Sequence, residues 1–147
     1  MGILNALRGT RIYLDTNIWI YALEGYQPFI ANLTQLFQAI DDGALTAVTS
    51  ELSLAEALVK PMQNQNIPQQ EAYKQILSSS THLLVAPVSR DLLINAAQLR
   101  ASTITLKLPD AIHAATAQLH QCTTFLTNDQ RFRSVPSLQV ILLSQIS

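Results

Sequence analysis

The sequence contains few of the residues that mark a secreted or thiol-dependent protein. Cys122 is the only cysteine, so the chain cannot form an internal disulfide, which suits a reducing cytoplasm. A single cysteine beside apolar residues is usually a small core residue, and no His–Asn context marks Cys122 as a nucleophile. We therefore expect a cytoplasmic protein without thiol catalysis.

Charge is also scarce. Asp, Glu, Lys and Arg make up 13% of the chain, which is about half of the usual share. The net charge is −1, so the chain lacks the strongly basic character of a dedicated nucleic-acid-binding protein. A nucleic acid would have to be held by bound metal ions and a few placed Arg and Lys side chains. A charge-poor surface is easily desolvated and favours a partner or a self-association interface.

Long apolar runs are absent as well. No stretch approaches roughly 18 consecutive apolar residues, so we expect no membrane span. The apolar segment 12–23 is interrupted by Asp15 and Asn17, and no small-residue cleavage site follows it. With 147 residues, of which 48% are apolar, the chain is long enough for one hydrophobic core. We expect a single domain over residues 1–147.

Short apolar runs alternate with helical patterns along the chain. Runs of consecutive apolar residues indicate parallel strands that helices cover on both faces. Pro61 is expected just beyond a helix end, and Pro87 within a strand indicates either an edge of the sheet or an early end of the strand. The sequence thus predicts a three-layer α/β/α domain with a mainly parallel sheet of about five strands. Strands are expected at 11–14, 45–49, 83–88, 123–127 and 139–143, and helices at 16–23, 28–40, 50–59, 69–79, 89–101 and 109–120.

Four of the ten acidic residues fall where such a sheet would gather them at one edge. Asp15 ends the first predicted strand, and Asp129 follows the fourth strand by two residues. Glu56 lies on the helix after the second strand, and Asp110 lies in the first turn of the helix that begins at Pro109. Because ligands of parallel sheets bind beyond the carboxyl ends of the strands, these four acids are candidate site residues.

Each acid alone has an ordinary structural explanation. Asp15 could cap the following helix, and Asp129 could be a turn residue. Glu56 could close a capping box with Ser53, and Asp110 could be favoured by the helix dipole. Together, however, converging carboxylates repel one another, and a bound divalent cation relieves that repulsion. Oxygen ligands select Mg²⁺ or Mn²⁺, and a water activated by such an ion can hydrolyse a phosphodiester.

Four stretches carry these acids: Ile12-Tyr-Leu-Asp-Thr-Asn17, Ser50-Glu-Leu-Ser-Leu-Ala-Glu56, Leu108-Pro-Asp-Ala-Ile-His-Ala-Ala-Thr-Ala117 and Phe125-Leu-Thr-Asn-Asp129. Together they resemble the PIN domain, and in particular the ribonuclease toxins of bacterial VapBC toxin–antitoxin pairs. A lone Asp-Thr-Asn would be a weak signal, but four motifs in family order and at family-like spacing are a strong one. The resemblance covers about residues 11–143.

The resemblance implies a metal-dependent endoribonuclease that hydrolyses RNA with one or two Mg²⁺ or Mn²⁺ ions. Asp15, Glu56 and Asp110 match the three core acids of the family, and Asp129 matches a fourth acid whose role varies more. The family also implies an antitoxin that occludes the site, and its toxins often form homodimers. We therefore expect an RNA substrate, a cognate antitoxin and compatibility with a homodimer.

Other polar residues accompany these acids. By the same resemblance, Thr127 matches a hydroxyl that supports the acids by hydrogen bonding, and Asn17 and Asn128 match polar residues beside the site. His113 lies one turn from Asp110, so it is a candidate contact to the RNA or to a metal-binding side chain. A packed helix histidine is the more frequent case, and it is the interpretation that the sequence favours.

Arg131 and Arg133 follow Asp129 closely and are candidate contacts to RNA phosphates. A solvated pair of arginines explains them equally well.

Two other enzyme classes fit the motifs poorly. A haloacid-dehalogenase-type phosphatase needs a second Asp as general acid at position 17, where this chain has Asn17. A response-regulator receiver needs an extra acidic pair near the first strand and a strand-end Lys late in the chain, and neither is present. The remaining alternatives are a stand-alone RNA-processing nuclease and a weakly active RNA- or protein-binding module.

Overall fold

The computed structural model of the chain describes residues 2–146 and is built on one sheet of five parallel strands. The strand order is β3-β2-β1-β4-β5, so β1 lies in the middle and the chain changes direction across the sheet after β3. This confirms the predicted α/β fold with a parallel sheet. The strands are β1 (Arg11–Leu14), β2 (Thr46–Ser50), β3 (Leu83–Ala86), β4 (Thr124–Thr127) and β5 (Val140–Leu142).

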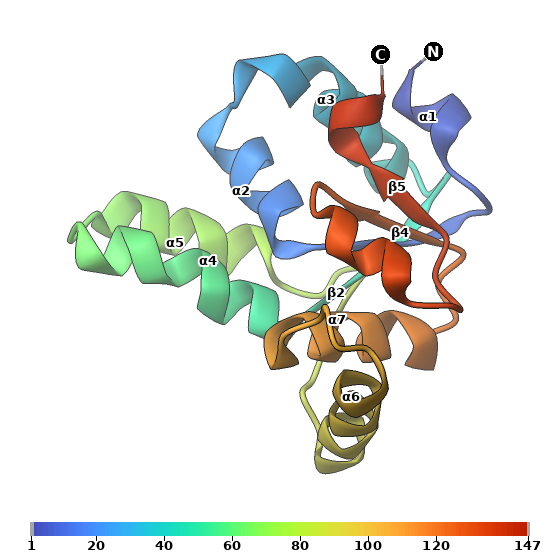
Figure 1. The fold of residues 1–147 in the computed structure, drawn as a ribbon. Helices are drawn as coiled ribbons and strands as arrows, with labels where there is room; N and C mark the ends of the chain where they lie inside the picture. Colours follow the sequence, from blue (N-terminus) through green and yellow to red (C-terminus); the bar gives the residue numbers. More distant parts are fainter. Residues whose placement is uncertain (1, 147) are drawn as a thin grey trace.

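Helices connect the strands and cover both faces of the sheet (Figure 1). The first turns of α2, α4 and α7 meet near the centre of the molecule, while α4 and α5 project together to one side. The helices are α1 (Ile3–Ala6), α2 (Thr16–Glu24), α3 (Gln27–Asp41), α4 (Glu51–Gln63), α5 (Ile67–Ile76), α6 (Arg90–Ser102) and α7 (Leu108–Leu119), with the 3-10 helices η1 (Gln130–Ser134) and η2 (Leu143–Gln145).

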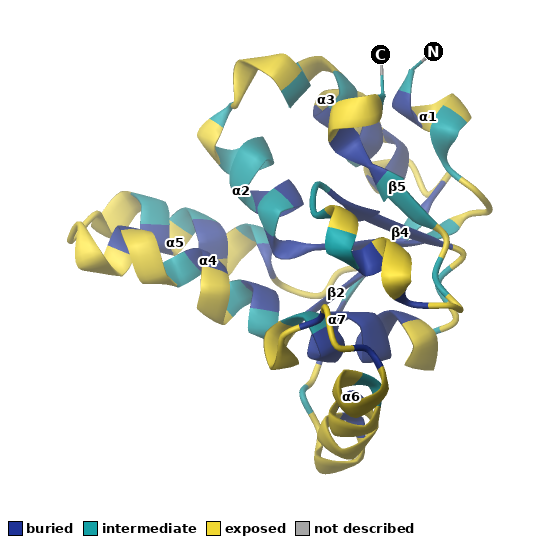
Figure 2. Ribbon diagram, in the orientation of Figure 1, coloured by how far each residue is buried: buried dark blue, intermediate teal, exposed yellow. Residues whose placement is uncertain are grey.

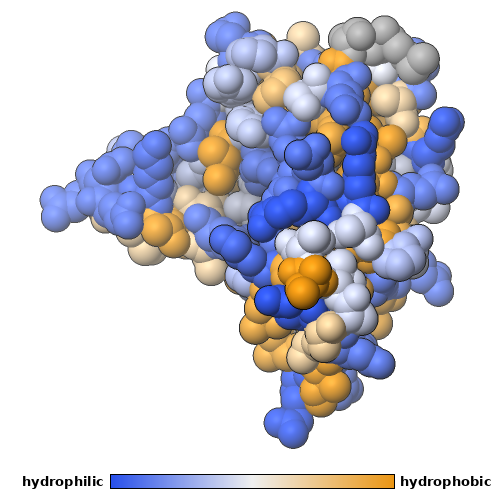
Figure 3. All heavy atoms as spheres, in the orientation of Figure 1, coloured by the Kyte–Doolittle hydropathy of each residue, from blue (hydrophilic) through white to orange (hydrophobic). Residues whose placement is uncertain are grey.

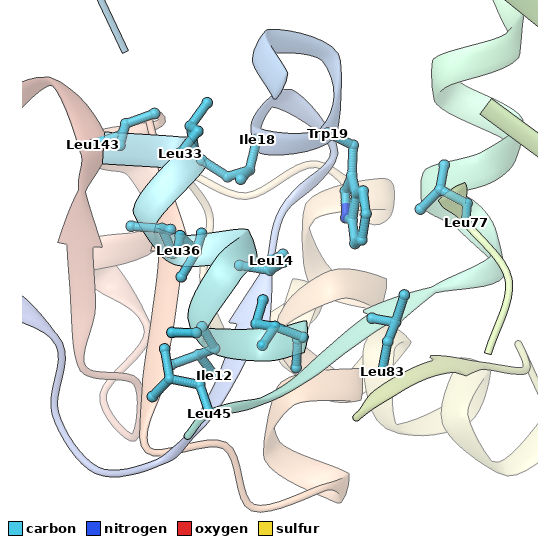
Figure 4. Close-up of a cluster of buried hydrophobic side chains, with 14 of the residues drawn as sticks. Ile12, Leu14, Ile18, Trp19, Leu33, Leu36, Leu45, Leu77, Leu83 and Leu143 are labelled. Atoms are coloured by element: carbon cyan, nitrogen blue, oxygen red, sulfur yellow. The ribbon is translucent and has the colours of Figure 1, made fainter. Parts of the chain in front are cut away.

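Alternate residues of β1 belong to two separate hydrophobic cores, one on each face of the sheet. Ile12 and Leu14 point to the face that α1, α2 and α3 cover, where Leu33 and Leu36 of α3 pack against them (Figure 4). Tyr13 points to the opposite face, which α7 and η1 cover. This alternation follows from the two-residue period of a strand and produces the predicted three-layer arrangement.

Helix α7 is buried on almost every side. Its alanines face both the sheet and α6, so α7 lies between them, and Figure 2 shows it buried over much of its length while α6 is largely exposed. A helix that is apolar all round is expected in such a buried position. The burial of α7 fixes the position of its first turn, which carries one of the candidate acids.

The structure corrects several predicted boundaries. Pro61 lies inside α4, which runs to Gln63 instead of ending near residue 59. Proline removes only one helical hydrogen bond, and Pro61 is buried, so tertiary packing outweighs the local break. The short helices α1 and η1 have no counterpart in the prediction. Strand β3 ends at Ala86, before Pro87, and forms an edge of the sheet, as predicted.

Within residues 2–146, none of the helices has the length and apolar character that crossing a membrane requires.

Candidate active site

The four predicted acids lie at the carboxyl ends of the two central strands and at neighbouring helix starts. Asp15 directly follows β1 and caps α2, and Asp129 follows β4 and caps η1. Glu56 lies in the second turn of α4, and Asp110 lies in the first turn of α7. Connections leave β1 and β4 toward opposite edges of the sheet, so the space between their ends is the switch point where parallel sheets bind ligands.

Asp15 is the most buried of the four acids, with 6% of its surface exposed. Its Oδ1 accepts a hydrogen bond from the backbone N–H of Thr16 at 2.8 Å, and its Oδ2 accepts one from the Thr127 hydroxyl at 2.6 Å. Burial raises the pKa of Asp15, and His113 and the Thr127 hydrogen bond counteract this rise. The two hydrogen bonds fix both oxygens of a carboxylate that is poor in solvent.

Glu56 is held by side chains of two other helices, Thr16 of α2 and His113 of α7. Its Oε1 accepts hydrogen bonds from the Thr16 hydroxyl at 2.7 Å and from His113 Nε2 at 2.6 Å. Burial raises the pKa of Glu56, but the hydrogen bond from His113, the charge of His113 and the hydrogen bond from Thr16 together outweigh burial, and the pKa is lowered overall. Glu56 is therefore an ionised carboxylate at neutral pH, with a fixed orientation.

His113 is 2% exposed and links the core to the acids. Its Nδ1 lies 2.6 Å from the hydroxyl of Tyr13, and its Nε2 lies 3.8 Å from Asp15 Oδ1 as well as bonding Glu56. Burial lowers the pKa of His113, but the Glu56 hydrogen bond and the charges of Asp15, Glu56 and Asp110 together outweigh burial and raise the pKa overall. The sequence favoured a packed helix histidine, and the structure adds contacts to two candidate acids.

Arg131 joins the other two acids. Its Nε lies 3.0 Å from both carboxylate oxygens of Asp129, and its Nη2 also binds Asp129 Oδ2. Its Nη1 lies 3.3 Å from Asp110 Oδ2. The hydrogen bonds from Arg131 lower the pKa of Asp129. Asp110 also accepts a hydrogen bond from the backbone N–H of Lys107, so it helps to cap α7 as well as belonging to the cluster.

We define the acidic cluster as Asp15, Glu56, Asp110 and Asp129. Thr127 connects Asp15 with Asp129 within it. Its hydroxyl donates to Asp15 and accepts a hydrogen bond from the backbone N–H of Asp129 at 3.1 Å. The cluster is thus one continuous network, which includes a histidine at one end and an arginine at the other. Figure 3 shows hydrophilic residues across the middle of the face that Figure 1 presents.

The other predicted site residues, Asn17, Asn128 and Arg133, form no hydrogen bond with the four acids in the part of the chain that the structure describes. Asn17 follows the start of α2, and its buried Oδ1 finds no hydrogen-bond partner among residues 2–146. Asn128 Oδ1 accepts a hydrogen bond from the Ser144 backbone N–H, so this side chain fixes the chain after β5. Arg133 is exposed and bonds Gln145, away from the acids.

Sequence reasoning did not single out Tyr13, Thr16 or Ser53 as part of the site. Thr16 binds Glu56, and Ser53 lies 3.4 Å from the Thr16 hydroxyl. Position offers a signal for two of them, because Thr16 follows an acid at a strand end and Ser53 lies one turn before Glu56. No local sequence pattern could have identified Tyr13, because an aromatic residue in an apolar strand is usually a core residue.

The four acids differ in exposure: Asp15 is buried, whereas the side chain of Glu56 is 37% exposed. A groove of about 450 Å³ lies elsewhere, between α2, α3 and the end of α5, and apolar residues such as Trp19 and Phe37 line it. None of the four acids lines that groove.

The donor atoms of the cluster fit a hard divalent cation. Carboxylate oxygens are the ligands that Mg²⁺ and Mn²⁺ prefer, and the guanidinium of Arg131 shows that a positive charge is accommodated between Asp110 and Asp129. Within residues 2–146, no three His, Cys, Asp or Glu side chains are close enough together to hold a metal ion as they stand. The four acids are the candidate ligands of such an ion, and their side chains would have to move closer together to hold it.

The fold and the cluster define an α/β domain with a carboxylate site at the switch point of a parallel sheet. The family model of the PIN domain matches residues 12–138, which is most of the chain. The chain belongs to the PIN domain family, as its motifs indicated. No curated protein sequence matches the chain.

Solved structures of toxin–antitoxin proteins share this fold. VapBC2 from Rickettsia felis, bound to a DNA fragment from their promoter, matches with 20% identity and a TM-score of 0.70 over 90% of this chain and 98% of that one. A toxin–antitoxin complex from Klebsiella pneumoniae matches with 25% identity and a TM-score of 0.67 over 92% and 99%. VapC20 from Mycobacterium tuberculosis, a sarcin-ricin loop cleaving toxin, matches with 18% identity and a TM-score of 0.64 over 78% and 86%.

Proposed function

We propose that this protein is a metal-dependent endoribonuclease and the toxin of a type II toxin–antitoxin pair. The observation that carries this proposal is the continuous network of four acids at the switch point of a PIN domain fold. Such a concentration of carboxylates carries an excess of negative charge that its neighbouring cations do not balance, and an RNA backbone would be repelled without a bound metal ion.

In this proposal Asp15, Glu56, Asp110 and Asp129 hold Mg²⁺ or Mn²⁺. When bound, the ion would activate a water molecule and stabilise the charge on the phosphoryl oxygens. The chain supplies orientation: Thr127 and the Thr16 backbone N–H fix both oxygens of Asp15. Such supporting hydrogen bonds keep ligand carboxylates in place before the ion arrives.

His113 supports the other half of the site. Glu56 when ionised only accepts hydrogen bonds, so His113 Nε2 donates the proton in their 2.6 Å contact. The Tyr13 hydroxyl fixes the ring from its opposite side. We propose that His113 orients Glu56 and does not contact the RNA directly, because the imidazole is buried.

An antitoxin is the partner that the structural neighbours suggest, because several of them are toxin–antitoxin complexes. A protein that covers the acidic edge would block access of RNA to the four acids. The stand-alone RNA-processing nuclease keeps the same chemistry without this partner. A small neighbouring gene for a DNA-binding protein, and growth arrest when the chain is expressed without it, would separate the two.

The experiment that tests the nuclease activity compares the wild type with Asp15→Asn on labelled structured RNA, with Mn²⁺ or Mg²⁺ and with EDTA. Asn keeps the shape of Asp15 but removes its charge, so we expect cleavage to fall by roughly a hundredfold or more. Asp91→Asn is the matched control, because Asp91 is exposed at the start of α6, outside the acidic cluster.

Cleavage that needs metal, is lost in Asp15→Asn and persists in Asp91→Asn would support the proposal. Equal cleavage by the wild type and Asp15→Asn would refute this site as the origin of the activity. Absence of both cleavage and metal binding would favour the binding module with a PIN fold.

A further inference from the structure

Arg131 was predicted to contact RNA phosphates, but its side chain is already paired with two of the candidate acids. Its guanidinium bonds both oxygens of Asp129 and lies 3.3 Å from Asp110 Oδ2. These are two of the four acids that the proposed function assigns to the metal. A bidentate guanidinium–carboxylate pair is among the strongest polar contacts in proteins, so Arg131 occupies these oxygens firmly.

The position of Arg131 is fixed by its helix. Asp129 caps η1 by accepting the Arg131 backbone N–H at 3.0 Å, and the neighbouring Phe132 is buried against Phe125. Arg133, two residues on, points elsewhere and bonds Gln145. One arginine of η1 is therefore directed to the acids by the backbone, and the other is not.

A divalent ion and a guanidinium cannot share these oxygens without cost. Both are cations, and like charges at one site repel each other. The same lone pairs of Asp110 and Asp129 would also have to serve both. The Arg131 side chain is 39% exposed, so it can leave for solvent without any rearrangement of the core.

We propose that Arg131 is a built-in cation that competes with the divalent ion for Asp110 and Asp129, and thereby sets the metal affinity of the site. This inference rests on the proposed function, because it takes these acids to be metal ligands. In the absence of metal, Arg131 balances part of the charge of the cluster. Metal binding displaces it, so the affinity of the site is lower than four free carboxylates would give.

The test measures Mn²⁺ binding by titration calorimetry for the wild type, Arg131→Gln and Arg133→Gln. Arg131→Gln removes the competing charge, and we expect Mn²⁺ to bind about tenfold more tightly, the change expected when one charge-assisted contact no longer has to be broken. Arg133→Gln removes an equal charge from the same helix, and we expect it to leave the affinity unchanged.

A second measurement follows Arg131 directly. Titration of the wild type with Mg²⁺ should move the Nε–H resonance of Arg131 in a nitrogen–proton NMR spectrum toward the position of an exposed arginine such as Arg133. The Arg133 resonance should stay in place.

Equal or weaker Mn²⁺ binding by Arg131→Gln would overturn the inference, and so would an Arg131 resonance that does not move. Equal gains in both variants would also overturn it, because they would reflect net charge alone. If the wild type cleaves RNA in a metal-dependent manner while Arg131→Gln binds no more tightly, the inference fails and the nuclease proposal stands. If no variant binds Mn²⁺, both fail.

Discussion

At the scale of single residues, the site depends on side chains that each serve two partners. Thr127 donates to Asp15 and accepts from the backbone of Asp129, and His113 lies between Tyr13 and Glu56. A buried polar group that loses its partner costs more than the hydrogen bond itself contributes, so these residues are sensitive positions. Their removal should change stability as well as activity.

His113→Leu should lower the free energy of unfolding by about 1–3 kcal/mol, measured by urea denaturation at pH 6. The variant leaves the buried Tyr13 hydroxyl without its hydrogen-bond partner. The loss of the His113–Glu56 contact should cost less stability, because the Glu56 side chain is 37% exposed. His120→Leu is the control, because the side chain of His120 takes no part in the network and is only partly buried. Equal losses in the two variants would contradict this role.

The effect of His113→Leu should also depend on pH. Because Glu56 and Asp15 outweigh burial and raise the pKa of His113, its protonated form is favoured in the folded state. A raised pKa stabilises the fold fully below the unfolded value of about 6.5, and this contribution is lost as the pH rises through the folded value. The gap between wild type and variant should narrow from pH 6 to pH 9. A difference in stability that widens over this range would contradict a raised pKa of His113 in the folded state.

At the scale of secondary-structure elements, η1 brings two candidate residues to the acidic edge. It begins directly after Asp129, and Phe132 anchors it in the core with its ring centroid 4.5 Å from that of Phe125. Val135, also buried, follows its end. A short 3-10 helix has little stability of its own, so this anchor decides where Asp129 and Arg131 lie.

Phe132→Ala should destabilise the fold by about 3–5 kcal/mol, because it removes a fully buried ring and leaves a cavity. It should also weaken Mn²⁺ binding, since η1 would no longer be held beside the site. Phe29→Ala is the matched control: Phe29 is only partly buried on α3 and contacts Tyr21 and Tyr26, remote from η1. Unchanged Mn²⁺ affinity in folded Phe132→Ala would show that η1 does not position the site.

At the scale of the whole molecule, the strand order places the site and the overall charge limits how it binds RNA. Because β1 is central and β4 is its neighbour, Asp15 and Asp129 meet at the switch point of the sheet. The chain has nine Lys and Arg residues against ten acids, so no general attraction draws RNA to it. Arg131 is moreover paired with two of those acids.

In EDTA, the wild type should therefore bind RNA only weakly, with a Kd above about 10 µM at physiological salt, which falls in the range of non-specific contacts. Filter binding or fluorescence anisotropy with a labelled hairpin measures this. Submicromolar binding in EDTA would mean that a basic surface, and not the metal site, captures the RNA.

The sequence by itself determined the parallel α/β sheet and the order of its elements. Strand β1 was predicted with its observed bounds, because a short apolar run that ends in Asp is a local signal. The positions of Asp15 and Asp129 at strand ends also followed from local patterns, since parallel strands share one carboxyl edge. The PIN motifs then indicated the family, which the family model confirms.

Only the tertiary structure decided which side chains pair within the site. His113 and Glu56 are 57 residues apart, and Tyr13 and His113 are 100 residues apart, so no helical or strand period relates them. The occupation of Asp110 and Asp129 by Arg131 depends on the unpredicted helix η1 and its buried anchor Phe132. Local patterns fix the direction of a side chain relative to its own element, whereas packing between distant elements fixes its partners.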